Sequence, residues 1–306
     1  MQNQSSFNHT GGWDSFNLSL HNVLLVINII GALLHYTIWI RLFVQKTKFD
    51  LAFIFALCYI GTDLVLTTFY FIQHAIRIQS WISITPVFCY FEAYGMFYFN
   101  IYGSYCLTTL NIGRYWQIVR NQNIYMIHPR RVICSFIFFC VWILLNFIIQ
   151  DLFGWCNVIE IAGASCFATY TNIFVQIWNI TVILAMPIII SLFLLYRALF
   201  YIRTIHIEQT IIHHNHHRQL IVHTSIFYSI WLCLWFPLIL ITFLNVNQIN
   251  QWVVFIGSIA NTIEIAIDPM ISFFIDKRFA RIWKKFSQFI VSRLKLSINS
   301  QVHPAV

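Results

Sequence analysis

The sequence predicts an all-α protein, a bundle of seven transmembrane helices followed by a short amphipathic helix on the cytosolic side. Of its 306 residues, 59% are apolar and 9% are charged, whereas soluble domains carry about 25% charged residues. The apolar residues are grouped in seven stretches, each long enough for the ~20-residue helix that crosses a bilayer. Almost all Lys and Arg residues lie on one side of these stretches, as in multi-pass membrane proteins.

The seven stretches are expected to be helices, because lipid offers no hydrogen-bond partners to the backbone of an open strand. They cover residues 22–45, 51–75, 86–112, 132–154, 173–202, 220–245 and 251–275. The domain plan that follows is an extracellular amino terminus at 1–21, a membrane domain at 22–275, an amphipathic helix at 276–290 and a cytosolic tail at 291–306.

The basic residues predict the orientation of the bundle. Of the 18 Lys and Arg residues, 17 fall on one side of the predicted spans, and only Arg77 falls on the other. Because cytosolic loops are enriched in Lys and Arg, we expect the amino terminus outside a plasma membrane and the carboxyl tail in the cytosol. Three glycosylation sequons agree with this, at Asn3, Asn8 and Asn17, whereas a fourth at Asn179 lies inside a span. The basic residues are dispersed between spans, which argues against nucleic acid as a partner.

The segment after the last span has an amphipathic pattern. Phe279, Ile282, Trp283 and Phe286 fall at helical spacing, and cations occupy the opposite face. We expect a short helix that lies on the anionic inner leaflet, with membrane lipid as its partner.

Short motifs follow one another along the spans in a fixed order. The second span contains Ile60-Gly-Thr-Asp63-Leu, and the third begins near Cys89 and ends with Gly113-Arg-Tyr115. The sixth span contains Leu234-Trp-Phe-Pro237, and the seventh ends with Asp268-Pro-Met-Ile-Ser272. Further matches are Trp81, Trp142, Pro187 and Phe279. With these motifs at their spacing, the chain over residues 22–290 resembles the rhodopsin-like (class A) G-protein-coupled receptors.

The resemblance implies a receptor that converts an extracellular ligand into activation of a heterotrimeric G protein through outward movement of the sixth helix. The switch and coupling residues would be Arg114, Tyr115, Trp235, Pro237 and Pro269. Pro237 removes one backbone hydrogen bond and kinks its helix.

The resemblance also implies a disulfide between Cys89 and the loop that joins the fourth and fifth spans. That loop faces the oxidising side of the membrane and offers Cys156 and Cys166. Cys166 is preferred because it lies in the middle of the loop, whereas Cys156 is close to the end of a span.

The resemblance places a ligand cavity in the extracellular half of the bundle. Its expected wall is aromatic and apolar, with Glu92 near the mouth, and suits a peptide with a basic group or an apolar small molecule. The predicted wall residues are Glu92, Tyr94, Met96, Phe97, Asn100, Trp235, Leu238, Ile239, Thr242, Phe255 and Ser258. A retinal pigment is excluded because Thr262 stands where such proteins carry Lys, and an amine receptor is excluded because Met96 stands where they carry Asp.

Three acids lie within the predicted spans, where a carboxylate is costly and usually marks function. Glu264 and Asp268 are four residues apart and share a helix face, and in the resembling family this face borders Asp63. One hypothesis is a cation site, with Na⁺ bound at Asp63, or a proton-sensitive cluster that biases the receptor's conformation. The alternative is that one or two of the acids are protonated and hydrogen-bonded.

Several residues depart from the family pattern. Gly113 replaces the Asp that precedes the family's Arg, and His217 stands where many members carry an acid that restrains it. The resting contact of Arg114 is therefore expected to be weak, which predicts either high basal activity or an atypical, arrestin-biased receptor. Ser272 replaces the family's Tyr in the seventh span.

Other function classes fit the sequence less well. A transporter or channel predicts internal repeats and paired helix breaks, and the sequence contains neither. Asp63 and Asp268 could imitate an aspartyl dyad, but the flanking motifs favour a receptor, and no catalytic function is expected. The histidines at residues 213–217 lack a Cys or acid to complete a metal site, so we expect a helix end there.

Overall fold

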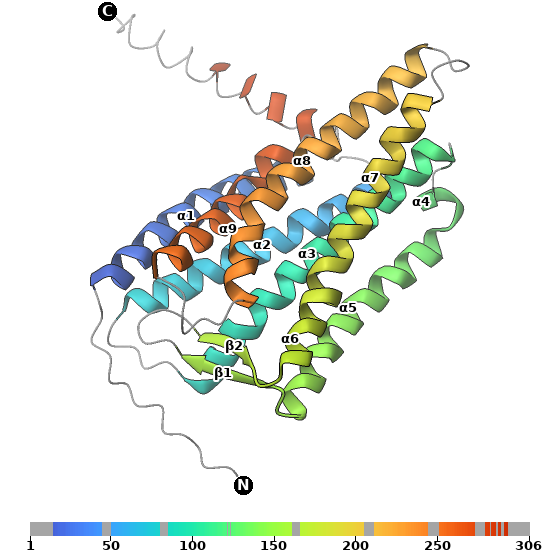
Figure 1. Ribbon diagram of the computed structural model, residues 1–306. Helices are drawn as coiled ribbons and strands as arrows, with labels where there is room; N and C mark the ends of the chain where they lie inside the picture. The colour runs from blue at the N-terminus through green and yellow to red at the C-terminus, as the bar shows by residue number, and fades with distance from the viewer. Residues whose placement is uncertain are drawn as a thin grey trace, which may run out of the picture.

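The computed structural model of the chain is an all-α bundle of long helices that run side by side (Figure 1). It describes residues 15–44, 50–79, 85–120, 122, 124–160, 166–204, 211–243, 251–272, 279–281, 283–285, 287–288 and 291–292. The helices are α1 (Ser15–Val44), α2 (Leu51–Ile78), α3 (Pro86–Val119), α4 (Ile124–Ile127), α5 (Pro129–Leu152), α6 (Ile173–Asn179), the π-helical η1 (Ile180–Ala185), α7 (Met186–Thr204), α8 (Ile211–Phe243) and α9 (Gln251–Ile271).

A β-hairpin interrupts the helical pattern between α5 and α6. Strands β1 (Cys156–Glu160) and β2 (Cys166–Tyr170) pair antiparallel, with Cys156 opposite Tyr170. The hairpin lies against the amino-terminal end of α3 (Figure 1). The sequence patterns did not predict these strands.

Local capping explains where several helices begin. The Asp50 carboxylate accepts a hydrogen bond from the Phe53 N–H at 2.8 Å, and Asn172 caps α6 through the Phe174 N–H at 2.8 Å. Thr85 caps α3, and Pro86 occupies its first turn. Such residues satisfy the free N–H groups of a first turn, so the predicted starts at 51, 86 and 173 agree with the structure.

Four of the described helical segments are long and apolar enough to cross a membrane: Leu18–Val44, Leu51–Ile78, Pro129–Leu152 and the continuous segment Ile173–Thr204. Their outward faces carry large apolar side chains, and Leu33, Phe138 and Ile189 are each more than 60% exposed. These helices are compatible with a multi-pass membrane protein. The other long helices, α3, α8 and α9, carry buried polar residues such as Glu92, Thr224 and Glu264, and seven spans stay a prediction.

Two prolines leave backbone carbonyls that neighbouring helices satisfy. Pro269 has no N–H, so the Ile265 carbonyl one turn earlier loses its helical partner, and the His35 ring of α1 contacts that carbonyl at 3.0 Å. Pro187 follows η1, and there the Tyr105 hydroxyl donates to the Val182 carbonyl at 2.8 Å. These contacts join α1 to α9 and α3 to η1 within the core.

The segment after α9 packs on the bundle. Residues 279–281 and 283–285 are helical, as the amphipathic pattern predicts. Phe279 is fully buried and packs on Phe53, with ring centroids 5.2 Å apart. The Trp283 indole donates to the Pro269 carbonyl at 2.7 Å. Ile282 and Phe286 lie outside the described residues.

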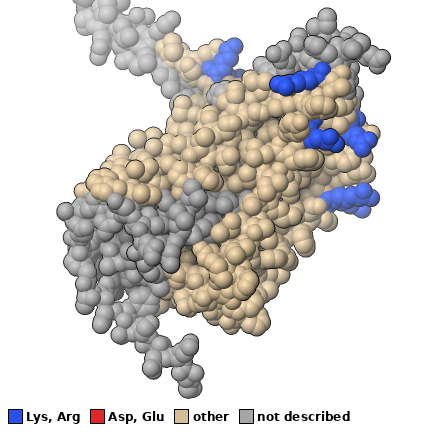
Figure 2. All heavy atoms as spheres, viewed as in Figure 1, with Lys and Arg blue, Asp and Glu red and all other residues tan. Residues whose placement is uncertain are grey.

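The two ends of the bundle differ in charge. On the face shown in Figure 2, the Lys and Arg side chains gather near the end where α7 finishes and α8 begins. The hairpin lies at the opposite end (Figure 1).

Candidate functional site

A disulfide holds the hairpin on α3. Cys89 and Cys166 are bonded, and their Cα atoms are 5.3 Å apart. This is the preferred pairing of the two that the sequence left open. Cys156 is a buried free thiol in β1, and burial raises the pKa of this thiol above its ordinary value, which disfavours the reactive thiolate.

A buried ion pair lies directly beside this disulfide. The Arg77 guanidinium contacts the Glu92 carboxylate at 2.5 Å, and both side chains are 1% exposed. The same carboxylate accepts hydrogen bonds from the Gln73 amide at 2.6 Å and from the Cys166 N–H at 3.1 Å. The pair therefore fixes α2, α3 and β2 together. Glu92 had been expected at the mouth of a ligand cavity, but its charge is already compensated by Arg77.

A chain of hydrogen bonds crosses the middle of the bundle. The Trp235 indole of α8 donates to the Asn100 side chain of α3 at 3.1 Å. Asn100 in turn lies 3.5 Å from the Tyr70 hydroxyl of α2, which accepts from Asn261 of α9 at 3.1 Å. Trp231 stacks below Trp235 at 4.5 Å between ring centroids. Four helices therefore meet through groups that can exchange partners when one helix moves.

The other predicted cavity residues face different neighbours. Met96 packs beside Leu66, Phe69, Tyr70 and Ile265, on the same side as Asn100. Tyr94 and Phe97 instead pack toward α5, because they lie on another face of α3. Phe255 contacts the Trp252 ring, and the Ser258 carbonyl accepts from Thr262. The side chains of Leu238, Ile239 and Thr242 lie outside the described residues.

The three acids of the spans converge on one buried cluster with a tyrosine. Asp63, Glu264 and Asp268 are at most 3% exposed. Asp63 and Glu264 are both close enough to Asp268 for their charges to interact. The Tyr59 hydroxyl donates to Asp268 and lies 3.5 Å from Glu264. Because ionised carboxyl groups this close repel one another, a proton or a cation within the cluster would lower the repulsion.

Sequence reasoning missed Tyr59, although a signal was present. Tyr59 precedes Asp63 by four residues, which places both side chains on one face of α2. On α3, the Ser104 hydroxyl donates to the Ile101 carbonyl of its own helix at 2.7 Å. Among the described residues, no group of three or more His, Cys, Asp or Glu is placed to hold a metal ion.

Arg114, at the basic end of α3, contacts α8. The Arg114 guanidinium donates to the Thr224 hydroxyl, and we call this the Arg114–Thr224 contact. Thr224 follows His217 by two helical turns; the side chain of His217 lies outside the described residues. Tyr115 packs toward a cluster formed by Ile118, Ala198 and Ile221. The resting contact of Arg114 with α8 therefore includes a hydroxyl group, that of Thr224.

Gly113 lies beneath an aromatic ring. A Cβ atom at residue 113 would overlap the ring and hydroxyl of Tyr125 in α4. The Tyr125 hydroxyl donates to the Thr109 carbonyl at 3.4 Å, and its ring packs on Phe55. Burial raises the pKa of Tyr125 to about 12, even though the nearby Arg114 charge acts to lower it. The Tyr125 hydroxyl therefore stays neutral and fills the space in which the resembling family carries Asp.

The glycosylation sequons have different surroundings. Asn3 and Asn8 lie outside the described residues, and Asn17 lies in the first turn of α1, where its side chain is not described. Asn179 is fully buried, and its amide exchanges hydrogen bonds with Gln150 at 2.8 and 2.9 Å. This burial agrees with the expectation that the fourth sequon stays unmodified.

Comparison with known proteins gives no further identification. No family model matches the chain, and no curated protein matches it. The likeness to class A receptors therefore rests on the motifs of the chain and on the contacts that those motifs make.

Proposed function

We propose that the protein is a receptor of the rhodopsin-like (class A) type, which converts binding of an extracellular peptide or small molecule into activation of a heterotrimeric G protein. The observation that carries the proposal is the Arg114–Thr224 contact, because it ties the basic end of α8 to α3 by a bond that a tilt of α8 would break. The proposal includes a plasma-membrane location, seven spans and an extracellular amino terminus.

The geometry of α8 allows a small tilt about Pro237 to produce a large displacement at Thr224. Pro237 lies inside α8 and weakens the helix at that level. Thr224 is 13 residues earlier, or about 20 Å along the helix axis. A tilt of ~15° about Pro237 would carry Thr224 by roughly 5 Å, at the 1.5 Å rise per residue of an α-helix. That displacement separates Thr224 from Arg114 and exposes the guanidinium to a cytosolic partner.

In this proposal, the movement of α8 starts when a ligand breaks the hydrogen bond between Trp235 and Asn100. Trp235 is two residues, or about half a turn, from Pro237, and the bond joins the same two helices, α8 and α3. A ligand that competes for Asn100 or presses on the indole releases α8 at this level. The polar chain through Tyr70 and Asn261 links the same point to α2 and α9, so four helices can respond to one ligand.

Basal signalling tests the proposal without a known ligand. We expect Thr224→Ala to raise ligand-independent G-protein activation, because Arg114 loses its partner on α8. A hydrogen bond to a charged group contributes about 1.5–3 kcal/mol, so the ratio of active to resting protein should rise by about tenfold or more. Arg114→Ala should abolish the signal. The measurement is nucleotide exchange on a panel of purified G proteins, with the full-length protein in lipid nanodiscs.

Thr204→Ala is the matched control for this substitution. The Thr204 hydroxyl donates to the Phe200 carbonyl of its own helix at 2.8 Å, so its loss leaves α3 and α8 in place. If no G protein responds to any variant although all variants fold, the G-protein proposal fails. Recruitment of arrestin by Thr224→Ala in the same experiment would then support the atypical, arrestin-biased alternative.

The acid cluster is proposed to bias the resting state through a shared proton. The Tyr59 hydroxyl already donates to Asp268, which favours proton sharing over Na⁺ coordination at that carboxylate. However, Asp63 Oδ2 and Asp268 Oδ1 have no hydrogen-bond partner among the described residues, so a bound Na⁺ remains the competing hypothesis. In either case the cluster links α2 to α9 near the middle of the bundle.

Isosteric substitutions distinguish the two hypotheses. We expect Tyr59→Phe to lower the free energy of unfolding by about 1–3 kcal/mol, because a buried carboxyl loses its donor. Glu264→Gln should cost less, because the amide keeps the shape and the hydrogen bonds. The stability of both variants is measured by thermal melting in NaCl and in choline chloride. A melting temperature that depends on sodium, and loses this dependence in Glu264→Gln and Asp268→Asn, would show a cation site instead. If both variants keep the sodium and pH dependence of signalling unchanged, the cluster has no regulatory role.

A further inference from the structure

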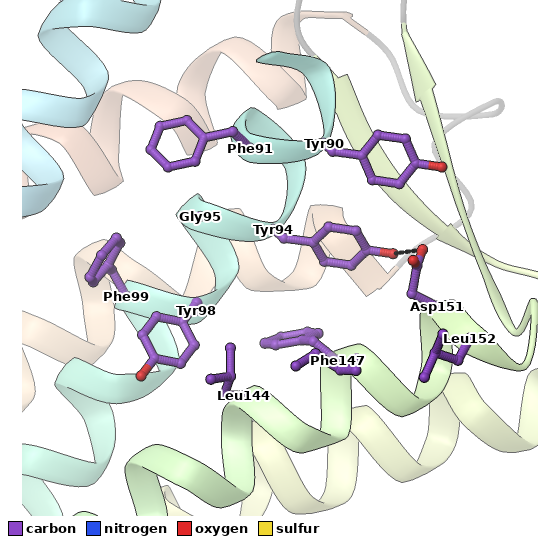
Figure 3. Close-up of a pocket in the computed structure, with 11 residues that line it drawn as sticks. Tyr90, Phe91, Tyr94, Gly95, Tyr98, Phe99, Leu144, Phe147, Asp151 and Leu152 are labelled. Carbon is purple, nitrogen blue, oxygen red and sulfur yellow. Dashed lines mark hydrogen bonds between the residues drawn. The ribbon is translucent and has the colours of Figure 1, made fainter. Parts of the chain in front are cut away.

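A cavity of about 430 Å³ lies between α3 and α5, in the halves of both helices next to the hairpin (Figure 3). Its size is within the range of small-molecule sites. It opens on the outside of the bundle, because Phe91 is 55% exposed and Leu144 is 48% exposed. In a membrane, a ligand would therefore enter the cavity laterally, from the lipid. The lining residues are Tyr90, Phe91, Tyr94, Gly95, Tyr98, Phe99, Leu144, Phe147, Ile148, Asp151 and Leu152.

Aromatic side chains line the cavity, and they pack against other aromatic rings of α2 and α5. Phe91 packs on Phe69 of α2 at 4.9 Å between ring centroids, and Tyr94 packs on Phe147 at 5.8 Å. Gly95 also lines the cavity, and because it has no side chain it leaves this part of the wall open. Figure 3 shows Tyr94 and Tyr90 on one side of α3, Phe91 and Phe99 on the other, and the Phe147 ring of α5 between the two helices. Aromatic faces attract cations as well as apolar groups.

Asp151 is the charged residue of this lining. Its Oδ1 accepts a hydrogen bond from the Tyr94 hydroxyl at 3.1 Å (Figure 3). Of the 18 Lys and Arg residues, only Arg77 falls on this side of the predicted spans. Arg77 is already paired with Glu92 at 2.5 Å. The exposed Asp151 carboxylate can therefore accept a cationic group from a ligand.

The axial position of Asp151 defines how a ligand would lie. Asp151 is in the last turn of α5, and the stacked rings of Phe153 and Trp155 follow it. Aromatic residues of this kind gather at the membrane–water interface. Leu144, at the other end of the lining, is seven residues earlier, about 10 Å deeper along the helix. The cavity therefore offers an anionic group at the interface and an aromatic wall beneath it.

From this arrangement we propose that the cavity binds a lipophilic amine from the surrounding leaflet, with its ammonium on Asp151 and its apolar body against the α3 and α5 rings. An amphiphile already lies in a bilayer with its charge at the interface and its apolar part inward, so it can enter without turning over. The site lies outside the bundle interior that holds Trp235 and Asn100. The inference does not depend on the proposed receptor function.

Photolabelling of the full-length protein in phosphatidylcholine nanodiscs tests the site. The probe is a hexylbenzylamine that carries a diazirine, and the comparison probe is the corresponding hexylbenzyl alcohol. We expect the amine to label peptides within 90–99 and 144–152. Asp151→Asn should weaken amine labelling about tenfold, because a charge-assisted contact is lost, and should leave alcohol labelling unchanged. Leu144→Trp should block both probes by filling the cavity.

Leu145→Trp is the matched control, because Leu145 is 46% exposed on the same helix but does not line the cavity. It should label as the unmodified protein does. Equal loss of amine and alcohol labelling in Asp151→Asn would overturn the proposal, because the carboxylate would then not recognise the charge. Labelling that persists in Leu144→Trp, or that maps to other helices, would also overturn it and indicate a cavity filled by lipid chains.

Discussion

Replacing Arg77 by Met should lower the free energy of unfolding by about 3–5 kcal/mol, because it leaves the Glu92 carboxylate buried without a counter-ion. Both partners are 1% exposed, so water cannot take the place of the guanidinium. The same carboxylate holds Gln73 and the Cys166 N–H, so the damage extends to the attachment of the hairpin. Thermal melting and the fraction of protein that reaches the cell surface measure the effect.

A second substitution separates the cost of the unpaired charge from the loss of Arg77 itself. In Arg77→Met with Glu92→Gln, no buried charge is left, and the amide oxygen can still accept from one of the two donors, Gln73 or the Cys166 N–H, which contact different carboxylate oxygens of Glu92. We expect this double variant to recover most of the lost stability. Arg130→Met is the control, because Arg130 is exposed at the other end of the bundle. If Arg77→Met and Arg130→Met melt at the same temperature, the buried pair does not contribute to stability.

The helices were largely predictable because hydropathy and capping are local properties. Asp50, Thr85 with Pro86, and Asn172 mark helix starts within a few residues of the apolar runs. The ends were less predictable: α3 continues to Val119 and α8 begins at Ile211, beyond the predicted spans at 86–112 and 220–245. Backbone hydrogen bonds continue a helix past the apolar stretch, whereas hydropathy reports only the part that suits lipid.

The contacts of the candidate site were harder to predict, because they depend on how neighbouring helices are rotated. The receptor resemblance predicts that Asp63, Glu264 and Asp268 lie together. In the structure these three acids form one buried cluster with Tyr59. It could not show that Glu92 faces Arg77, since the two residues are on different helices and no local pattern links them. The cavity beside Asp151 was missed for the same reason: it is formed by facing sides of α3 and α5.

The substitution of Gly113 by Asp tests the largest departure from the resembling receptors. Asp is the residue that precedes their Arg, yet we expect it to lower the free energy of unfolding here by about 1–3 kcal/mol or more. A Cβ at this position overlaps the Tyr125 ring, and Tyr125 is 4% exposed and packed on Phe55. Tyr125 would have to leave its site, together with α4, before the carboxylate could reach Arg114.

Matched glycine substitutions isolate the steric part of this effect. Gly113→Ala adds only the overlapping Cβ, whereas Gly61→Ala adds a Cβ that meets Trp39 at an ordinary 3.5 Å. Ala favours a helix over Gly by about 1 kcal/mol, so Gly61→Ala should be neutral or stabilising and Gly113→Ala should destabilise. In a double-mutant cycle, Tyr125→Ser should remove most of the cost of Gly113→Asp. Additive costs in that cycle would contradict the predicted overlap.

Gly113 and Tyr125 also determine how strongly the resting position of Arg114 depends on its contact with Thr224. Tyr125 replaces the volume of the family's Asp but not its charge, because burial raises the pKa of its hydroxyl to about 12. Tyr125 therefore brings no negative charge to Arg114, and the Thr224 hydroxyl is one contact of Arg114 with α8. In Gly113→Asp with Tyr125→Ser, the new carboxylate can reach Arg114 and compete with Thr224. Since two partners then share one guanidinium, Thr224→Ala should raise basal G-protein activation less in this background than in the unmodified protein.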